Sequence, residues 1–291
     1  MSAPKPPPVL YQYTRWTGVE GMIKSGVVWA THFESLNDRE EVWYAKSMLI
    51  HLAKALDEIP VERTRTGVPL AQCAVRALEL PPGLKYACVA SFSEEPDSLN
   101  QWVSYADHGA GFCVGVASKQ FEAVVKFANQ ERQHGVTWSL RRVVYEPCDQ
   151  TTALLDVLAK ATVCDVPTSG HDDCGRCDAI AEGFGSVALT LKDPHWHAER
   201  EWRLIGCSAT ANGMLLRASG TAHVAYREFL TASRDRSIKR PRALEFHSVS
   251  IGPKLFRDRA SWFAAIEALR VRRRVGFARE FRATASRATL K

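Results

Sequence analysis

The sequence lacks a run of about 18 consecutive apolar residues, the length that a membrane-spanning helix needs. The N-terminal stretch MSAPKPPPVL also lacks an apolar signal core before a cleavage-like site. We therefore expect a cytoplasmic protein that has no membrane partner. Hydrophobic residues make up 46% of the chain and charged residues 24%, which argues against wholesale disorder and against a fibrous repeat.

Several familiar catalytic and nucleotide-binding motifs are missing as well. The chain contains no Walker A lysine motif, no Gly-x-Gly-x-x-Gly loop between a strand and a helix, no Gly-x-Ser-x-Gly and no His-Glu-x-x-His. It shows neither a repeat period nor a low-complexity block. These absences argue against a P-loop or Rossmann protein, a hydrolase triad, a catalytic zinc and a repeat architecture.

Eight cysteines are present, but they are scattered through apolar segments, which is typical of reduced buried thiols and not of a disulfide framework. Much of the net charge of +6 comes from the C-terminal segment 270–291. We interpret this segment as a solvated basic tail, with contact to nucleic acid as the alternative.

Hydrophobic periodicity predicts short strands that are unevenly interleaved with helices. Gly26 is a stop signal for the first helix, while Asp38 and Glu41 form a capping-box pattern at the start of the second. The expected strands include residues 9–14, 27–33, 138–147 and 246–253, and the expected helices include residues 16–26, 38–59, 118–135 and 258–273. The pattern predicts an α+β fold in one domain, 1–291, with a helical, cysteine-containing insertion around 119–190.

Two carboxylates stand close together in the stretch HWHAEREWRLIG, residues 195–206. If this stretch is extended, alternation places Glu199, Glu201 and Arg203 on one face, with the two acids about 7 Å apart. Such a pair can divide labour, since one acid can stabilise a developing cation at a sugar carbon and the other can orient or deprotonate a nucleophile. The alternative is a charge ladder in which Arg203 neutralises one acid.

Aromatic and hydroxyl side chains gather in a second stretch, residues 91–112. Trp102 and Tyr105 are three apart on a predicted helix and share a face, while Ser91 and Ser93 lie on one side of the preceding strand. Together they suit a flat heteroaromatic ligand with a sugar attached. Packing in the core is the alternative interpretation of the aromatic pair.

A third candidate site is a group of potential metal ligands in residues 164–177. Cys164, His171, Cys174 and Cys177 include a Cys-x-x-Cys knuckle of the kind that closes a structural zinc site. The alternative is a loop of free thiols.

Five segments, taken in order, resemble a known family. These are LYQYT, VVWATHFESLNDREE, CVASFSEEPDSLNQWVSYADHGAGFCVGV, HWHAEREWRLI and VSIGP. They are similar to the bacterial domain of unknown function 2971 (DUF2971) family, which has a Leu-Tyr-Lys-Tyr-like first strand, an Asn-Asp turn, a Phe-Ser strand, a Trp-x-x-Tyr helix and a Glu-x-Glu-Trp-Arg strand. The resemblance spans nearly the whole chain.

That family in turn resembles the ADP-ribosyltransferase superfamily, which implies a split antiparallel or mixed sheet with flanking helices around an NAD cleft. The resemblance implies that Glu201 stabilises the oxocarbenium-like transition state and that Glu199 positions the acceptor. The superfamily often carries His or Arg where the first strand here has Gln12 or Tyr13, and the cofactor-gripping role is unfilled here unless nearby Arg15 takes it. The cofactor-binding candidates are Gln12, Tyr13, Arg15, Ser91, Ser93, Trp102, Tyr105 and Arg203.

The resemblance therefore implies an NAD-dependent ADP-ribosyltransferase that acts on a macromolecule, protein or nucleic acid, in a bacterial toxin or phage-defence setting. Two alternatives from other classes remain. One is a module that binds a nucleotide or nucleic acid without chemistry, and the other is a structural interaction domain.

Overall fold

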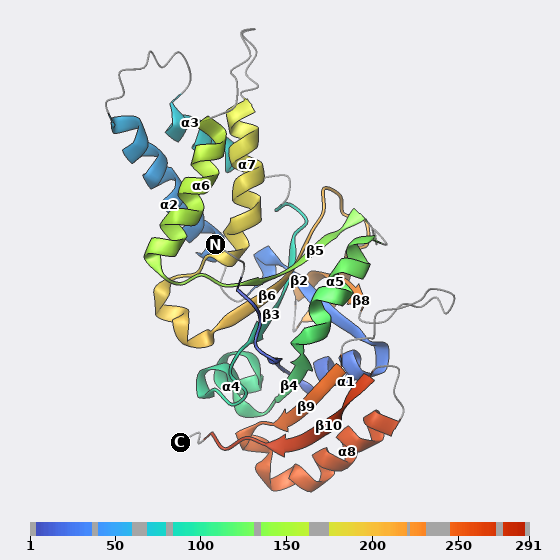
Figure 1. Ribbon diagram of the computed structural model, residues 1–291. Coiled ribbons are helices and arrows are strands. Elements are labelled where there is room, and N and C mark those ends of the chain that lie inside the picture. Colours follow the sequence, from blue (N-terminus) through green and yellow to red (C-terminus); the bar gives the residue numbers. More distant parts are fainter. Residues whose placement is uncertain are drawn as a thin grey trace.

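The computed structural model is a mixed α and β protein with a mostly antiparallel, open sheet and several helices (Figure 1). This confirms the α+β class in its coarse form. The structure describes residues 4–36, 40–59, 69–79, 84–130, 135–162, 175–219, 222–230, 245–271 and 276–288. No helix in these ranges has both the length and the apolar character that crossing a membrane requires.

The strands come from the whole length of the chain. They are β1 (Val9–Thr14), β2 (Val27–His32), β3 (Cys88–Ser93), β4 (Phe112–Ala117), β5 (Thr137–Arg142), β6 (Glu201–Cys207), β7 (Leu215–Ser219), β8 (Ala222–Leu230), β9 (Glu245–Ile251) and β10 (Gly276–Ala285). All strand pairs in this set are antiparallel except β9 with β10, which is parallel. The sheet is therefore mixed, as the sequence predicts.

The sheet divides at β3. Strand β6 pairs with β3 along all six residues of β3, so it occupies one entire edge. Strand β1 pairs with β3 only between Tyr11 and Ser93, and β2 pairs only with the first two residues of β3. Because both must use the remaining edge, β1 and β2 diverge along it. One branch continues through β4, β9 and β10, and the other through β8 and β7.

Helix α1 (Trp16–Ser25) connects the two diverging strands. It ends at Gly26, which has the left-handed φ of 68°, and the Gly26 N–H bonds back to the carbonyl of Met22. This confirms the predicted stop, because glycine adopts such a φ without steric cost. Val19 and Ile23 are buried against the sheet, so the helix turns the chain from β1 back into β2.

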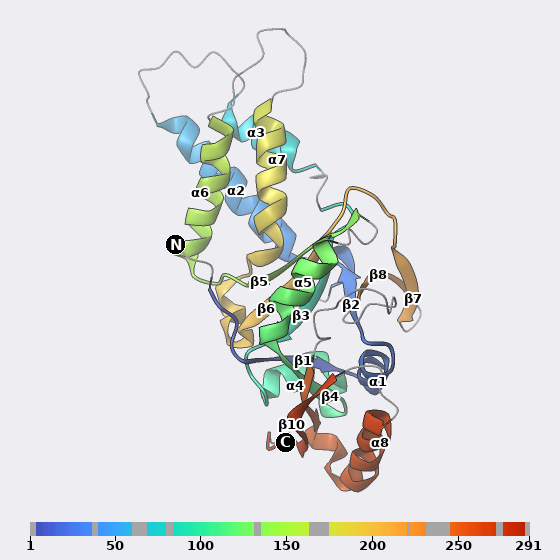
Figure 2. The same ribbon diagram turned by 45° about the vertical axis from the view of Figure 1, so that its right-hand side comes forward.

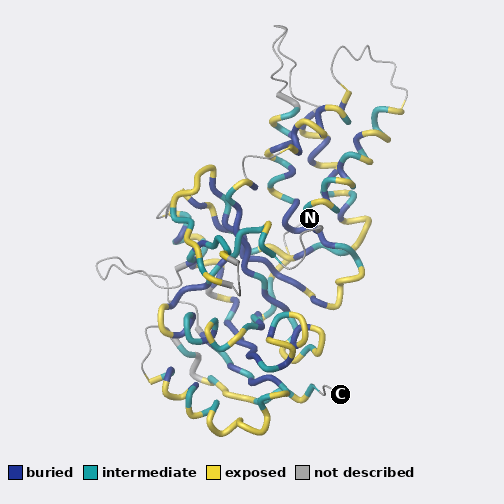
Figure 3. Tube along the Cα trace, turned by 180° about the vertical axis from the view of Figure 1, so that it is seen from behind, coloured by how far each residue is buried: buried dark blue, intermediate teal, exposed yellow. Residues whose placement is uncertain are grey.

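The remaining helices lie around the sheet (Figures 1 and 2). They are α2 (Glu40–Glu58), α3 (Leu70–Ala77), α4 (Leu99–Tyr105), α5 (Phe121–Gln130), α6 (Pro147–Thr162), α7 (Gly175–Val187) and α8 (Arg259–Val271). Helices α2, α3, α6 and α7 pack on one another around a core of their own, whereas α1, α5 and α8 share a core with the sheet. Figure 3 shows these buried segments surrounded by exposed turns.

The predicted insertion, around 119–190, and the predicted basic tail, 270–291, both contribute elements that pack with the rest of the described structure. Helices α6 and α7, from the range 119–190, pack with α2 and α3, while α5 and β5 from the same range pack with the sheet. The basic segment 270–291 contributes β10 to the sheet edge. Backbone pairing with β9 therefore anchors both ends of β10, with a register shift between Phe277 and Arg282.

Candidate functional site

A cavity of about 550 Å³ opens where β1 and β2 diverge from β3. Its walls come from both diverging strands, from β3, β6 and β7, and from α1, α2 and the end of α4. The volume lies within the range of small-molecule sites. Residues of both diverging strands line this hollow, so it lies at the split of the sheet.

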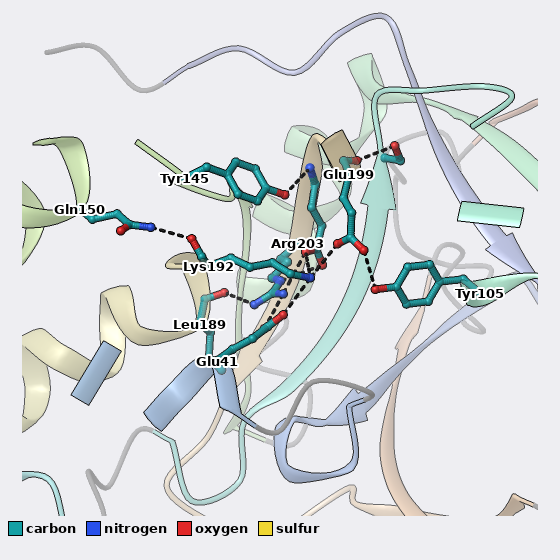
Figure 4. Close-up of polar contacts among 10 residues, drawn as sticks. Glu41, Tyr105, Tyr145, Gln150, Leu189, Lys192, Glu199 and Arg203 are labelled. Carbon is teal, nitrogen blue, oxygen red and sulfur yellow. Dashed lines mark hydrogen bonds and ion pairs between the residues drawn. The ribbon is translucent and has the colours of Figure 1, made fainter. Parts of the chain in front are cut away.

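One wall of the cavity is a buried cluster of charged side chains centred on Lys192 (Figure 4). Its ammonium nitrogen lies 2.9 Å from Oε1 of Glu41, 2.6 Å from Oε2 of Glu199 and 3.4 Å from Oε2 of Glu201. One amine thus contacts three carboxylates from three segments of the chain.

Arg203 is the second cation of this cluster. Its Nε and Nη2 donate to the two carboxylate oxygens of Glu201 at 2.8 and 2.9 Å, a bidentate pair. Nη2 also lies 2.6 Å from Oε2 of Glu41, and Nη1 donates to the Leu189 carbonyl at 2.9 Å. The alternative in which Arg203 neutralises an acid is therefore correct for Glu201, although the pair lines a cavity and does not lie on an outer surface.

Glu199 reaches the cluster in a different way from the one that the sequence predicts. Strand β6 begins at Glu201, and Glu199 instead ends the short 3-10 helix η6 (Pro194–Glu199). Arg200 between them is left-handed, with φ of 45°, which breaks the alternation of an extended chain. The expectation that both acids lie on one strand is therefore wrong, yet this bend still brings the two carboxylates to the same lysine.

The backbone around Lys192 is held in place by α6. Gln150 on that helix is fully buried and donates from Nε2 to the carbonyls of Lys192 and Val144, at 2.7 and 2.8 Å. Tyr44 on α2 donates in turn to the Gln150 side-chain oxygen at 2.7 Å. The helical part of the molecule thereby positions one of the two cations at the sheet.

The charges of the cluster do not cancel. Glu41, Glu199 and Glu201 provide three carboxylates against the two cations Lys192 and Arg203, so one negative charge remains when all are ionised. Burial makes such an imbalance costly. The cluster is therefore suited to holding a proton or to facing a cationic group in the cavity.

The pKa values of the two candidate acids shift in opposite directions. Burial alone would raise the pKa of Glu201, but the adjacent Arg203 and Lys192 charges lower that pKa to about 2. Burial raises the pKa of Glu199, against the opposing effect of Lys192. Glu201 is thus a permanent anion at neutral pH, and Glu199 is the acid that more readily takes up a proton.

Two tyrosines complete the cluster. The Tyr105 hydroxyl donates to Oε1 of Glu199 at 2.9 Å, and the Tyr145 hydroxyl accepts from the backbone N–H of Glu201 at 3.1 Å. Burial raises the pKa of both hydroxyls well above the usual range, so both stay protonated. Tyr105 lines the cavity and therefore connects Glu199 to any ligand bound there.

Most of the residues that the sequence singles out for catalysis and cofactor binding lie around this one cavity. Those that line it are Gln12, Tyr13, Arg15, Ser91, Tyr105, Glu199, Glu201 and Arg203. Ser93 and Trp102 do not. Ser93 is buried and donates to the Glu199 carbonyl at 2.7 Å. Trp102 is fully buried. Its indole N–H donates to Asp97, and its ring centroid lies 5.0 Å from that of Tyr13 in an edge-to-face contact, so it packs in the core as the alternative interpretation holds.

Three cluster members escape detection from the sequence. Glu41 has the spacing of a capping box, but Asp38 lies outside the described residues and both Glu41 oxygens bind cations of the cluster. Lys192 follows the mostly apolar run VALTL. Its only sequence signal was that a charged residue comes directly after that run. Tyr145 lies just beyond β5 and had no signal of its own.

The candidate zinc ligands fall mostly outside the described residues, since Cys164, His171 and Cys174 belong to the range 163–174. Cys177 is described and lies on α7. In the part of the chain that the structure describes, no group of three or more His, Cys, Asp or Glu side chains is placed to hold a metal ion. Structural zinc at Cys164, His171, Cys174 and Cys177 stays a prediction.

Comparison with known proteins adds one finding. Residues 101–204 match the model of a family described as "Protein of unknown function (DUF2971)". The matched segment runs from α4 into β6 and contains Tyr105, Tyr145, Lys192, Glu199, Glu201 and Arg203, which is most of the charged cluster with its two tyrosines. No curated protein and no solved structure matches the chain.

Proposed function

We propose that this chain, whose resemblance to the DUF2971 family is confirmed, transfers ADP-ribose from NAD to a macromolecule. The observation that carries the proposal is the convergence of eight candidate residues on the cavity at the split of the sheet. Those residues come from β1, α4, β3, η6 and β6 and from the turn before α1. If these residues were merely packed together in a hydrophobic core, so many polar side chains would not need to line a single cavity.

The charge of the cluster supports NAD as the substrate. The oxidised nicotinamide ring is cationic, and the ribosyl carbon gains positive charge as the bond to nicotinamide breaks. A buried wall with one uncompensated negative charge favours both. Glu201 keeps its charge through this step because its pKa is about 2.

The contacts of Glu201 define how it acts in this proposal. Both of its oxygens are bonded to Arg203, and Lys192 approaches one of them. A carboxylate held in this way is a poor nucleophile but a well-fixed anion. Glu201 therefore opposes the charge at the ribosyl carbon electrostatically, and its immobility means that little reorganisation is needed when that charge develops.

Glu199 has the properties of the proton acceptor. Its raised pKa increases its affinity for a proton, and Tyr105 and Lys192 fix both of its oxygens at the cavity wall. In the proposed step the bond between nicotinamide and the ribosyl carbon breaks, with its electron pair going to nicotinamide. A nucleophilic atom of the acceptor bonds to that carbon, and its proton passes to Glu199.

Incubation with NAD labelled in its adenylate part, together with bacterial lysate, tests the proposal. We expect the wild type to label the protein or the nucleic acid fraction, and both Glu201→Gln and Glu199→Gln to label at least tenfold less. Glu267→Gln is the matched control, because Glu267 lies on α8 in an exposed pair with Arg270. Equal labelling by wild type and Glu201→Gln would rule the proposal out.

A second candidate function is a nucleotide-binding module without chemistry. The observation that favours it is the complete ion pairing of the two acids, each of which is only 5% exposed. Such a module would be stabilised against heat by NAD, because ligands that bind only the folded state raise its stability. It would release no nicotinamide and label no acceptor, which separates it from the transferase.

A further inference from the structure

A third arginine lines the cavity, on the branch of the sheet away from the charged cluster. Arg217 lies on β7 and reaches the cavity beside β2, where its Nη2 donates to the Thr31 hydroxyl at 2.9 Å. The centre of its guanidinium is 5.3 Å from the Trp29 ring and 5.7 Å from the Tyr226 ring. Two aromatic rings and one hydroxyl thus hold the side chain in place.

Arg217, which is half-buried, differs from the two buried cations of the cavity in what it bonds. Lys192 and Arg203 are surrounded by carboxylates, whereas no carboxylate among the described residues forms an ion pair with Arg217. Its Nε is buried and has no hydrogen-bond partner in the described part of the chain. Burial lowers the pKa of Arg217, which reflects a charge that its surroundings do not offset.

Arg15 is the other arginine at the cavity, and it is less suited to binding an anion tightly. Its side chain is 71% exposed and lies 3.4 Å from Asp107, so water and a carboxylate already compete for it. A guanidinium held beside two aromatic rings presents its N–H groups with little loss of side-chain entropy on binding. Among the described cavity residues, Arg217 is therefore the cation with the greatest capacity to gain from an anionic ligand.

We propose that Arg217 binds the diphosphate of a nucleotide whose cationic ring faces the charged cluster. Planar guanidinium groups bind phosphate oxygens through paired N–H donors, and Arg217 lines the cavity without an ion pair to any carboxylate of the described residues. The cavity then has opposite charge preferences on its two sides, negative at β6 and positive at β7. This inference rests on the nucleotide cleft of the proposed function, but it concerns binding and does not require transfer.

Calorimetric titration with two ligands tests this assignment. ADP-ribose contains the diphosphate, and nicotinamide riboside contains the cationic ring without any phosphate. We expect Arg217→Gln to weaken ADP-ribose binding roughly tenfold to hundredfold and to leave nicotinamide riboside binding unchanged. Arg217→Lys keeps the charge but not the paired donors, so it should fall between Gln and wild type. Arg270→Gln, an exposed arginine on α8, is the control.

The outcomes separate this inference from the proposed transferase. Unchanged ADP-ribose binding in both Arg217 variants, equal weakening of both ligands, or failure of the wild type to bind ADP-ribose would each overturn the role of Arg217. If the Arg217 variants lose affinity for ADP-ribose but not for nicotinamide riboside, and the wild type labels no acceptor, the role of Arg217 is supported and the transferase proposal is refuted. Thermal unfolding of each variant without ligand shows whether a loss of binding merely reflects a loss of folding.

Discussion

Replacing Lys192 by methionine is the sharpest test of the charged cluster. The substitution keeps the length of the side chain but leaves three buried carboxylates with Arg203 alone. Removing one partner from a buried ion pair costs about 3–5 kcal/mol, because the other charge stays buried without compensation. Lys192 contacts three carboxylates at 3.4 Å or less, so we expect a loss at the upper end of this range.

Urea unfolding measures this loss directly. With a urea slope of about 3 kcal/mol per M, a loss of 3–5 kcal/mol shifts the midpoint down by about 1–1.7 M. Lys24→Met is the matched control, since Lys24 forms an exposed pair with Glu20 one helical turn away. Such surface pairs contribute about 0.3–0.5 kcal/mol, so the control midpoint should move by at most about 0.2 M.

A second substitution isolates the electrostatic cause. Adding Glu199→Gln to Lys192→Met removes one of the stranded carboxylates, so the double variant should regain about 1–3 kcal/mol relative to the sum of the two single losses. Equal midpoints for Lys192→Met and Lys24→Met, or strictly additive losses in the double variant, would refute the interpretation that these groups form one coupled cluster.

Two further predictions concern pH and redox state. The pKa of Glu201 is lowered to about 2 in the folded protein, so its ionised form contributes stability above the unfolded value near 4.5 and loses it as the pH falls from there toward 2. That span corresponds to roughly 3 kcal/mol, so urea midpoints measured between pH 6 and pH 2.5 should fall less steeply for Glu201→Gln than for wild type. For the redox state, NAD⁺ should raise the melting temperature more than NADH, because the reduced ring has lost the positive charge that the cluster favours while both share the diphosphate. Equal shifts with the two forms would contradict that preference.

Local sequence signals were sufficient to predict those helices and strands that depend mainly on their own residues. β1, α1, β2, β9 and α8 all occur where periodicity predicts them, and α1 ends at the glycine that the sequence indicates. Such signals succeed because alternation, helical spacing and a glycine stop act over only a few residues. The same signals identified Tyr105, Glu199 and Glu201 as candidate site residues, and all three line the cavity.

Local reasoning failed where one residue departs from the pattern around it. The alternation rule placed Glu199 on the strand with Glu201, but Arg200 takes a left-handed conformation and its guanidinium bonds to Glu95 at 2.7 Å. Glu95 is distant in sequence, so no window around residue 200 contains this contact. Trp102 packs in the core, which is the alternative interpretation of the aromatic pair, and its ring contacts Tyr13 on β1.

The sequence by itself determined the class of the fold, the family resemblance and the identity of the two acids, since these depend on residue types and short spacings. Only the tertiary structure decided that Glu41 and Lys192, 151 positions apart, meet at one ion pair, and that Arg217 enters the same cavity from β7. The physical reason is that charges interact through space: their partners follow from how the strands diverge and the helices pack, which no local pattern encodes.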